Sequence, residues 1–126
     1  MIYLLDTNIF LEILLGQQKA AECKRIFIEH SGNIAISDFS LHSIGVILFK
    51  HNKNSLFDAF ILDVMSNIEV VSLSSGSYSK LSETKENYHL DFDDAYQYQI
   101  ARENGFTIVT MDSDFKRARE VKVDFV

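Results

Sequence analysis

The sequence contains a single cysteine, Cys23, and no long hydrophobic run. One cysteine excludes an internal disulfide and a cysteine-based zinc cluster. A membrane-spanning helix would need about 20 consecutive apolar residues. The chain opens on the short apolar run 2–5 without a basic segment before it, so we expect no signal peptide. These features are typical of a cytoplasmic protein that has no membrane partner.

Several common catalytic motifs are also missing. There is no glycine-rich phosphate loop, no Gly-x-Ser-x-Gly turn and no His/Cys spacing suited to a metal. No repeat, low-complexity tract or linker interrupts the 126 residues, and 47% of them are hydrophobic. We therefore expect one domain, residues 1–126, with enough apolar side chains to form a core.

Short apolar runs alternate with helical patterns along the chain. Strands are predicted over residues 2–5, 34–36, 68–73, 106–110 and 121–126, the last at an edge. Helices are predicted over residues 9–14, 17–30, 39–50, 56–65, 74–88, 92–104 and 113–119. This alternation indicates a three-layer α/β fold, in which a mainly parallel sheet carries helices on both faces.

The helix predicted over residues 92–104 carries the most unusual cluster of side chains. Helical spacing predicts one buried face for its apolar residues Phe92, Ala95, Tyr96 and Ile100. Asp91 suits the N-cap, and Gly105 suits the position just after the last turn. Together with Asp93 and Asp94, the first turn holds more acids than capping requires.

Three acid-bearing turns account for the excess of negative charge. They hold six acids: Asp6, Asp91, Asp93, Asp94, Asp112 and Asp114. The chain has 18 acids against 12 Lys and Arg, for a net charge of −6, so leaving out these six balances the charges. Asp6 and Asp112 follow predicted strands, and ligands of parallel sheets bind beyond the carboxyl ends of strands. We therefore predict that the three turns meet in one acidic pocket.

Clustered carboxylates repel one another unless protons or a cation lie between them. Oxygen ligands favour hard cations such as Mg²⁺ or Mn²⁺, which can orient a phosphodiester, acidify water and stabilise a leaving oxygen. Structural roles stay open for these acids. Asp6, Asp91 and Asp112 could cap helices, and Asp93 could be a solvated charge in a first turn. Asp114 could hold the loop through backbone amides.

Four further residues are more simply explained by structure than by chemistry. Cys23 is expected to be a small core residue, and His42 to lie on a helix surface. Tyr96 and Tyr98 are expected to pack in the interior rather than to stack on bases. The candidate chemistry is therefore confined to the acidic turns.

The ordered set of motifs resembles a known family. The opening Ile2–Phe10 resembles that of PIN-domain ribonucleases, the family that includes the VapC-type toxins of bacterial toxin–antitoxin pairs. Asp94-Ala95 followed by Ala101, and then Thr110–Phe115, resemble its third and fourth acidic motifs. The resemblance spans essentially the whole chain. It implies a PIN fold, Mg²⁺- or Mn²⁺-dependent cleavage of RNA, a small antitoxin partner, and a homodimer or a complex with that partner.

The resemblance also assigns roles to individual residues. Three positions match the metal-coordinating catalytic acids: Asp6, Asp94 and Asp112. Three others match supporting positions around them: Asn8, Thr110 and Asp114. The family usually places a glutamate on the helix after the second strand, where this chain has Ser43, a neutral oxygen. Asp38 lies five residues earlier and is expected to cap that helix. The candidates to compensate for the missing glutamate are therefore Asp93 and Asp91.

Three functions remain as hypotheses. The first is a metal-dependent endoribonuclease, the toxin of a toxin–antitoxin pair. Its RNA would be contacted by a basic segment that could equally be a solvated helix face: Lys116, Arg117 and Arg119. The second is a PIN-like module with impaired catalysis, because of Ser43, that binds RNA or a partner. The third is a phosphate-transferring aspartyl enzyme or a receiver domain. It ranks lowest, because Asn8 stands where the former needs an acid and Met111-Asp112 where the latter needs a lysine.

Overall fold

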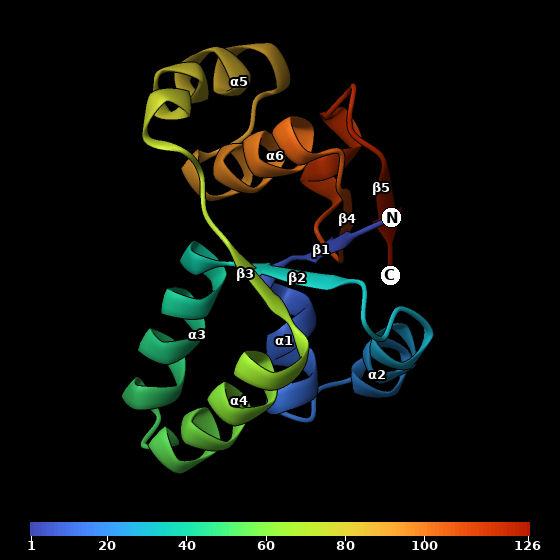
Figure 1. Cartoon of the computed structure of the whole chain (residues 1–126), viewed down its shortest axis with the longest axis vertical. Coiled ribbons are helices and arrows are strands. Elements are labelled where there is room, and N and C mark those ends of the chain that lie inside the picture. Colours follow the sequence, from blue (N-terminus) through green and yellow to red (C-terminus); the bar gives the residue numbers. More distant parts are fainter.

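Five parallel strands form the central sheet in the computed structural model, which describes all residues from 1 to 126 (Figure 1). Their order across the sheet is β3 (Glu69–Val71), β2 (Ile34–Ser37), β1 (Tyr3–Leu5), β4 (Thr107–Thr110) and β5 (Val123–Phe125). In the register of the two central strands, Leu5 of β1 lies opposite Val109 of β4. The chain leaves β1 toward β2 but leaves β4 toward β5. Open α/β sheets bind ligands at the point where the strand order reverses, which here lies between β1 and β4.

Helices cover both faces of the sheet (Figure 1). One face carries α1 (Thr7–Leu14), α2 (Ala20–Glu29), α3 (Asp38–Lys50) and α4 (Asn54–Asn67). The other carries α5 (Leu81–Tyr88) and α6 (Phe92–Asn104) with two 3-10 helices, η1 (Ser75–Lys80) and η2 (Ser113–Arg117). The predicted three-layer α/β fold is therefore confirmed. None of the helices combines the length and apolar character needed to cross a membrane.

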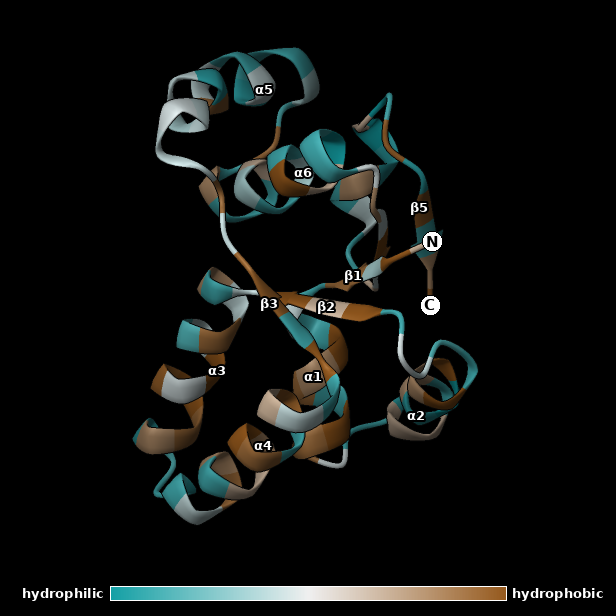
Figure 2. Ribbon diagram, viewed as in Figure 1, coloured by the Kyte–Doolittle hydropathy of each residue, from teal (hydrophilic) through white to brown (hydrophobic).

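The hydrophobic core consists of two clusters, one on each face of the sheet. Leu4 of β1 packs with residues of α6, whereas its neighbour Leu5 packs with residues of α1, α3 and α4. In β4, Ile108 and Val109 divide in the same way. Successive side chains of a strand point to opposite faces, so each buried strand contributes to both clusters. In Figure 2, hydrophobic residues are frequent on β2, α1 and α4, whereas α5 is mostly hydrophilic.

The boundaries of α6 agree with the prediction. Asp91 is at the N-cap, although its side chain makes no capping hydrogen bond, and Gly105 ends the helix with φ of 68°. A positive φ favours glycine, which explains why the helix stops there. The expected burial of Phe92 is wrong, because its side chain is 56% exposed. Phe92 is the first residue of α6, and the buried part of the helix begins two residues later, at Asp94.

Other elements differ from prediction mainly in their ends. The strand expected over 68–73 is shortened to β3, and the helix expected over 74–88 is divided into η1 and α5. The helix expected over 113–119 is η2, which ends at Arg117. The expected cap of α3 is wrong: Ser37, not Asp38, is the N-cap, and its hydroxyl accepts a hydrogen bond from the Ser40 amide. Asp38 is instead the first residue of the helix.

Candidate functional site

Asp6 lies where β1 ends and α1 begins, and it caps α1. Its Oδ1 accepts hydrogen bonds from the Thr7 amide at 2.8 Å and from Gln97 Nε2 at 3.5 Å. Its Oδ2 accepts from Thr110 Oγ1 at 2.7 Å and from Asn8 Nδ2 at 3.3 Å. The residue is 7% exposed, and this burial raises the pKa of the carboxyl, although three of the hydrogen bonds oppose the rise. Four donors fix both oxygens, so the carboxylate has one orientation.

Thr110, at the end of β4, connects the first acidic turn to the last. Besides donating to Asp6, its Oγ1 accepts a hydrogen bond from the Asp112 amide at 2.9 Å. Asn8 makes a second link, because its Oδ1 accepts from the Met111 amide at 3.4 Å. The strands β1 and β4 are neighbours, and these contacts hold the turns that follow them side by side. Thr110 and Asn8 thus lie where supporting residues were expected.

Asp94 brings the third acidic turn to the same place. It lies in the first turn of α6 and is 7% exposed. Burial raises the pKa of its carboxyl to about 8, and the carboxylates of Asp6 and Asp112 are the next largest causes. Of the three predicted catalytic acids, Asp6 and Asp112 therefore lie close enough to Asp94 for their charges to oppose its ionisation.

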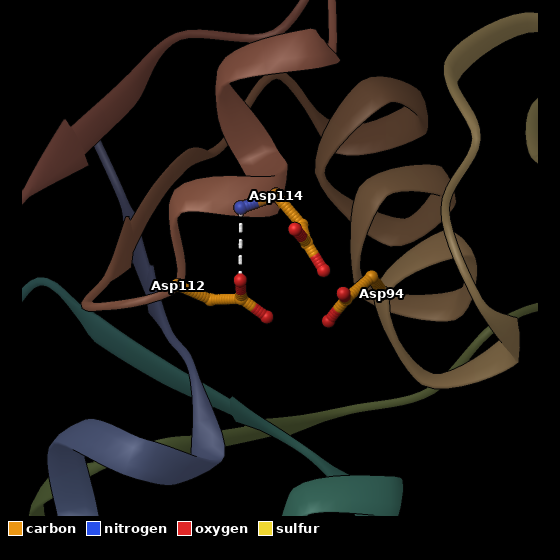
Figure 3. A group of neighbouring side chains, drawn as sticks. All are labelled: Asp94, Asp112 and Asp114. Carbon is orange, nitrogen blue, oxygen red and sulfur yellow. Dashed lines mark hydrogen bonds between the residues drawn. The ribbon is translucent and has the colours of Figure 1, made fainter.

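The tightest group of carboxylates is not the expected one. Oxygens of Asp94, Asp112 and Asp114 lie within 4.8 Å of one another, and Asp6 is outside this group (Figure 3). Asp112 caps η2, and its Oδ1 accepts a hydrogen bond from the Asp114 amide at 2.8 Å. This contact runs opposite to the prediction that Asp114 would accept from the loop. The Asp114 side chain lies near Asp94 (Figure 3), so a residue expected to support the site lies within it.

The two remaining acids of the α6 turn lie outside the buried group. Asp91 and Asp93 are both exposed. Asp91 contributes to the raised pKa of Asp94, after burial and the charges of Asp6 and Asp112. Partial burial, followed by the charge of Asp91, raises the pKa of Asp93. Of the two acids predicted as candidates to compensate for Ser43, Asp91 is thus the one that raises the pKa of Asp94.

The α3 side of the pocket is neutral. Ser43 is half-buried, and its side chain makes no hydrogen bond within the chain. Asp38 turns away, because its Oδ1 accepts a hydrogen bond from the Tyr96 hydroxyl at 2.7 Å. Ser40 is the α3 residue that reaches the pocket, with its Oγ 2.8 Å from Thr7 Oγ1. No carboxylate of α3 therefore joins the acids on β1, β4 and α6.

Sequence analysis missed Gln97, which is only 2% exposed. Its Nε2 donates to Ser40 Oγ at 2.7 Å and lies 3.5 Å from Asp6 Oδ1. One signal could have found it: Gln97 follows Asp94 by three residues, and such residues share a face of a helix. Tyr96 and Tyr98 are buried and His42 is exposed, as predicted.

The basic side chains after β4 have separate surroundings. Arg117 donates hydrogen bonds to the carbonyls of Tyr88 at 3.1 Å and His89 at 2.7 Å, and it pairs with Asp114 at 3.4 Å. Lys116 lies over the Phe125 ring, 5.9 Å from its centroid. Lys116 and Arg119 are exposed. Arg117 therefore ties η2 to the loop before α6 and holds one of the pocket acids.

Comparison with protein families places this arrangement in a known class. The model of the PIN domain family matches residues 3–121. The chain therefore belongs to the PIN domain family, as the sequence motifs predicted. No curated protein sequence matches significantly.

Solved structures share the fold at low sequence identity. A DNA-bound VapBC from Salmonella typhimurium has 16% identity and a TM-score of 0.82, over 99% of this chain and 98% of that one. A sarcin-ricin loop cleaving toxin of Mycobacterium tuberculosis, VapC20, has 17% identity and a TM-score of 0.79, over 95% and 98%. A toxin–antitoxin complex from Klebsiella pneumoniae has 19% identity and a TM-score of 0.78, over 94% of each chain.

Proposed function

We propose that this protein is a metal-dependent endoribonuclease that hydrolyses RNA phosphodiester bonds and acts as the toxin of a toxin–antitoxin pair. One observation carries the proposal: oxygens of Asp94, Asp112 and Asp114 converge within 4.8 Å beside the buried carboxylate of Asp6. Membership of the PIN domain family supports a nuclease. The similar fold of VapC20, whose name records cleavage of the sarcin-ricin loop, supports RNA as the substrate.

The donor set fits Mg²⁺ or Mn²⁺. All the candidate ligands are carboxylate oxygens, which hard divalent cations prefer, and no histidine or cysteine joins them. We propose that Asp94, Asp112 and Asp114 hold the cation and that Asp6 completes the site from β1. Bound there, a divalent cation would offset the clustered charge, activate water and stabilise the departing oxygen.

The protein residues have distinct tasks in this proposal. The neighbouring carboxylates favour a proton on Asp94, and a bound cation would displace that proton. Thr110 and Asn8 keep Asp6 in one orientation, so the site does not have to rearrange when it is loaded. The exposed Lys116 and Arg119 are available to contact RNA phosphates, whereas Arg117 is engaged in contacts within the chain.

The same comparisons support a protein partner. Structural neighbours include a toxin–antitoxin complex and DNA-bound VapBC. We propose that this chain likewise binds a small antitoxin protein, that it forms a homodimer or a complex with that partner, and that it cleaves RNA in the cytoplasm.

The test is cleavage of a mixed RNA pool by purified, partner-free protein in Mn²⁺, beside Asp6→Asn prepared identically. We expect Asp6→Asn to lose about 100-fold or more, because even groups that only orient a metal ligand can cost that much. Asp63→Asn is the matched control, since Asp63 is exposed on α4, a helix of the opposite layer. Equal cleavage by wild type and Asp6→Asn would point to another site or to a contaminating nuclease.

A second function is favoured by the neutral α3 side of the pocket. With Ser43 in place of an acid, the site has fewer charges with which to hold a cation. The chain would then be a PIN-like module that binds RNA or its partner with little catalysis. Absence of cleavage by folded wild type, with RNA binding retained, would support this function over the first.

A further inference from the structure

Gln97 is the polar side chain of the pocket whose hydrogen bonding is incomplete. It is 2% exposed, and its Oε1 is buried without any hydrogen-bond partner. A buried, unpaired carbonyl oxygen costs folding free energy, and an apolar side chain of similar size would avoid that cost. Packing alone therefore does not explain a glutamine at this position.

The contacts of the Gln97 amide lie in the pocket. Nε2 donates to Ser40 Oγ at 2.7 Å and also faces Asp6 Oδ1 at 3.5 Å. Ser40 Oγ in turn contacts Ser37 Oγ at 3.1 Å and Thr7 Oγ1 at 2.8 Å. Gln97 thus joins α6 and Asp6 to a group of hydroxyls on α1 and α3. It contributes no charge to this side of the pocket.

We propose that Gln97 is a positioning residue of the acidic pocket, which holds the Asp6 carboxylate from α6 and so sets the cation affinity of the site. This inference rests on the proposed function. Asp94 and Gln97 lie three residues apart on α6, so one helix face carries both a candidate ligand and a donor to Asp6. The contact of the Gln97 amide with Asp6 therefore helps to fix the position of α6, and with it Asp94, relative to Asp6.

Gln99 provides a matched comparison within the same helix. It is 3% exposed, nearly as buried as Gln97, but its amide contacts Thr84 and Glu103. Those residues belong to α5 and to the far end of α6. Replacing either glutamine by methionine keeps the length of the side chain and removes the amide. Only the change at position 97 removes a contact with Asp6.

The experiment is titration of Mn²⁺ by calorimetry into wild type, Gln97→Met, Gln99→Met, Gln97→Glu and Asp6→Asn. We expect Gln97→Met to weaken Mn²⁺ binding about 10-fold, as is usual for groups that orient a metal ligand. Gln99→Met should bind like wild type. Gln97→Glu should bind Mn²⁺ more tightly than wild type and melt at a lower temperature without metal, because it adds a carboxylate beside Asp6.

The outcomes separate the two proposals. If Asp6→Asn weakens binding but Gln97→Met binds like wild type, Gln97 only fills space and the inference is overturned while the metal site stands. The same holds if Gln97→Met and Gln99→Met weaken binding equally. If wild type does not bind Mn²⁺, or Asp6→Asn binds it equally well, the proposed metal site fails and the inference fails with it.

Discussion

Asp6 and Asp112 are joined through a single hydroxyl group. Thr110 Oγ1 donates to Asp6 Oδ2 at 2.7 Å and accepts from the Asp112 amide at 2.9 Å. The two acids belong to turns more than 100 residues apart in sequence, and the hydrogen bond of Thr110 to Asp6 alone spans 104 positions. Because one buried side chain serves both turns, a change there should alter stability and the pocket together.

Thr110→Val tests this link, because valine matches the shape of threonine without the hydroxyl. It leaves the Asp112 amide without its partner and removes a donor from Asp6. We expect a loss of about 1–3 kcal/mol in the free energy of unfolding, measured by urea denaturation, and weaker Mn²⁺ binding. Thr110→Ser keeps the hydroxyl and should retain most of both. A valine variant as stable as wild type would contradict the linking role.

The pKa of Asp94 predicts how the stability of the metal-free protein depends on pH. The pKa rises from 3.8 in the unfolded chain to about 8 in the folded protein. Below pH 4 the carboxyl is protonated in both states, and the stability that this proton gives is fully present. As the pH rises toward 8, the unfolded chain releases the proton more readily, so that stability is lost, by at most about 1.4 kcal/mol per pH unit.

Unfolding by urea in a chelator, from pH 5 to pH 9, measures this effect. We expect wild type to lose stability as the pH rises and Asp94→Asn to lose clearly less, because asparagine does not titrate. Mn²⁺ should largely flatten the trend in wild type, since its binding displaces the proton and becomes tighter by up to about tenfold per pH unit below pH 8, which offsets the loss. Parallel curves for the two metal-free proteins would show that Asp94 is not the titrating group.

Ser43→Glu tests whether the pocket lacks a carboxylate on α3. Ser43 is half-buried and one turn beyond Ser40, which reaches the pocket. We expect Mn²⁺ affinity to rise at least about tenfold, because each added carboxylate strengthens a site for a hard cation. His42→Glu is the control, since His42 is exposed and adjacent in sequence. If affinity does not rise, either another acid, Asp93 or Asp91, already fills that role or the proposed metal site is absent.

Substitutions of Arg117 and Lys116 should have different effects: the first should lower stability, and the second should weaken RNA binding. Arg117→Met removes hydrogen bonds to two backbone carbonyls and the ion pair with Asp114. We expect a loss of about 1 kcal/mol in unfolding free energy, since these contacts are partly exposed. Lys116→Met should leave stability nearly unchanged but weaken RNA binding and reduce its dependence on salt. Filter binding at several salt concentrations measures this, and equal effects of both variants on stability would argue against the distinction.

The local patterns were sufficient to predict α6 and the acids at strand ends. The N-cap position and the terminal glycine defined the helix, because caps depend on the local backbone. Apolar runs gave β1 and β4, and the topology of parallel sheets then placed Asp6 and Asp112 at one edge. Phe92 was misplaced because helical spacing gives the relative orientation of side chains but not where the neighbouring elements end.

The sequence by itself determined the α/β order, the family and the residue types of an acidic pocket, because periodicity, caps and motifs are local properties. The tertiary structure decided which acids meet. α6 is buried at eight consecutive positions, from Asp94 to Ala101, so its hydrophobic pattern does not distinguish the pocket side from the other faces of the helix. Gln97 and Asp114 join the site only because the fold brings α6 beside Asp6 and η2 beside Asp94. That arrangement depends on contacts between residues far apart in the chain.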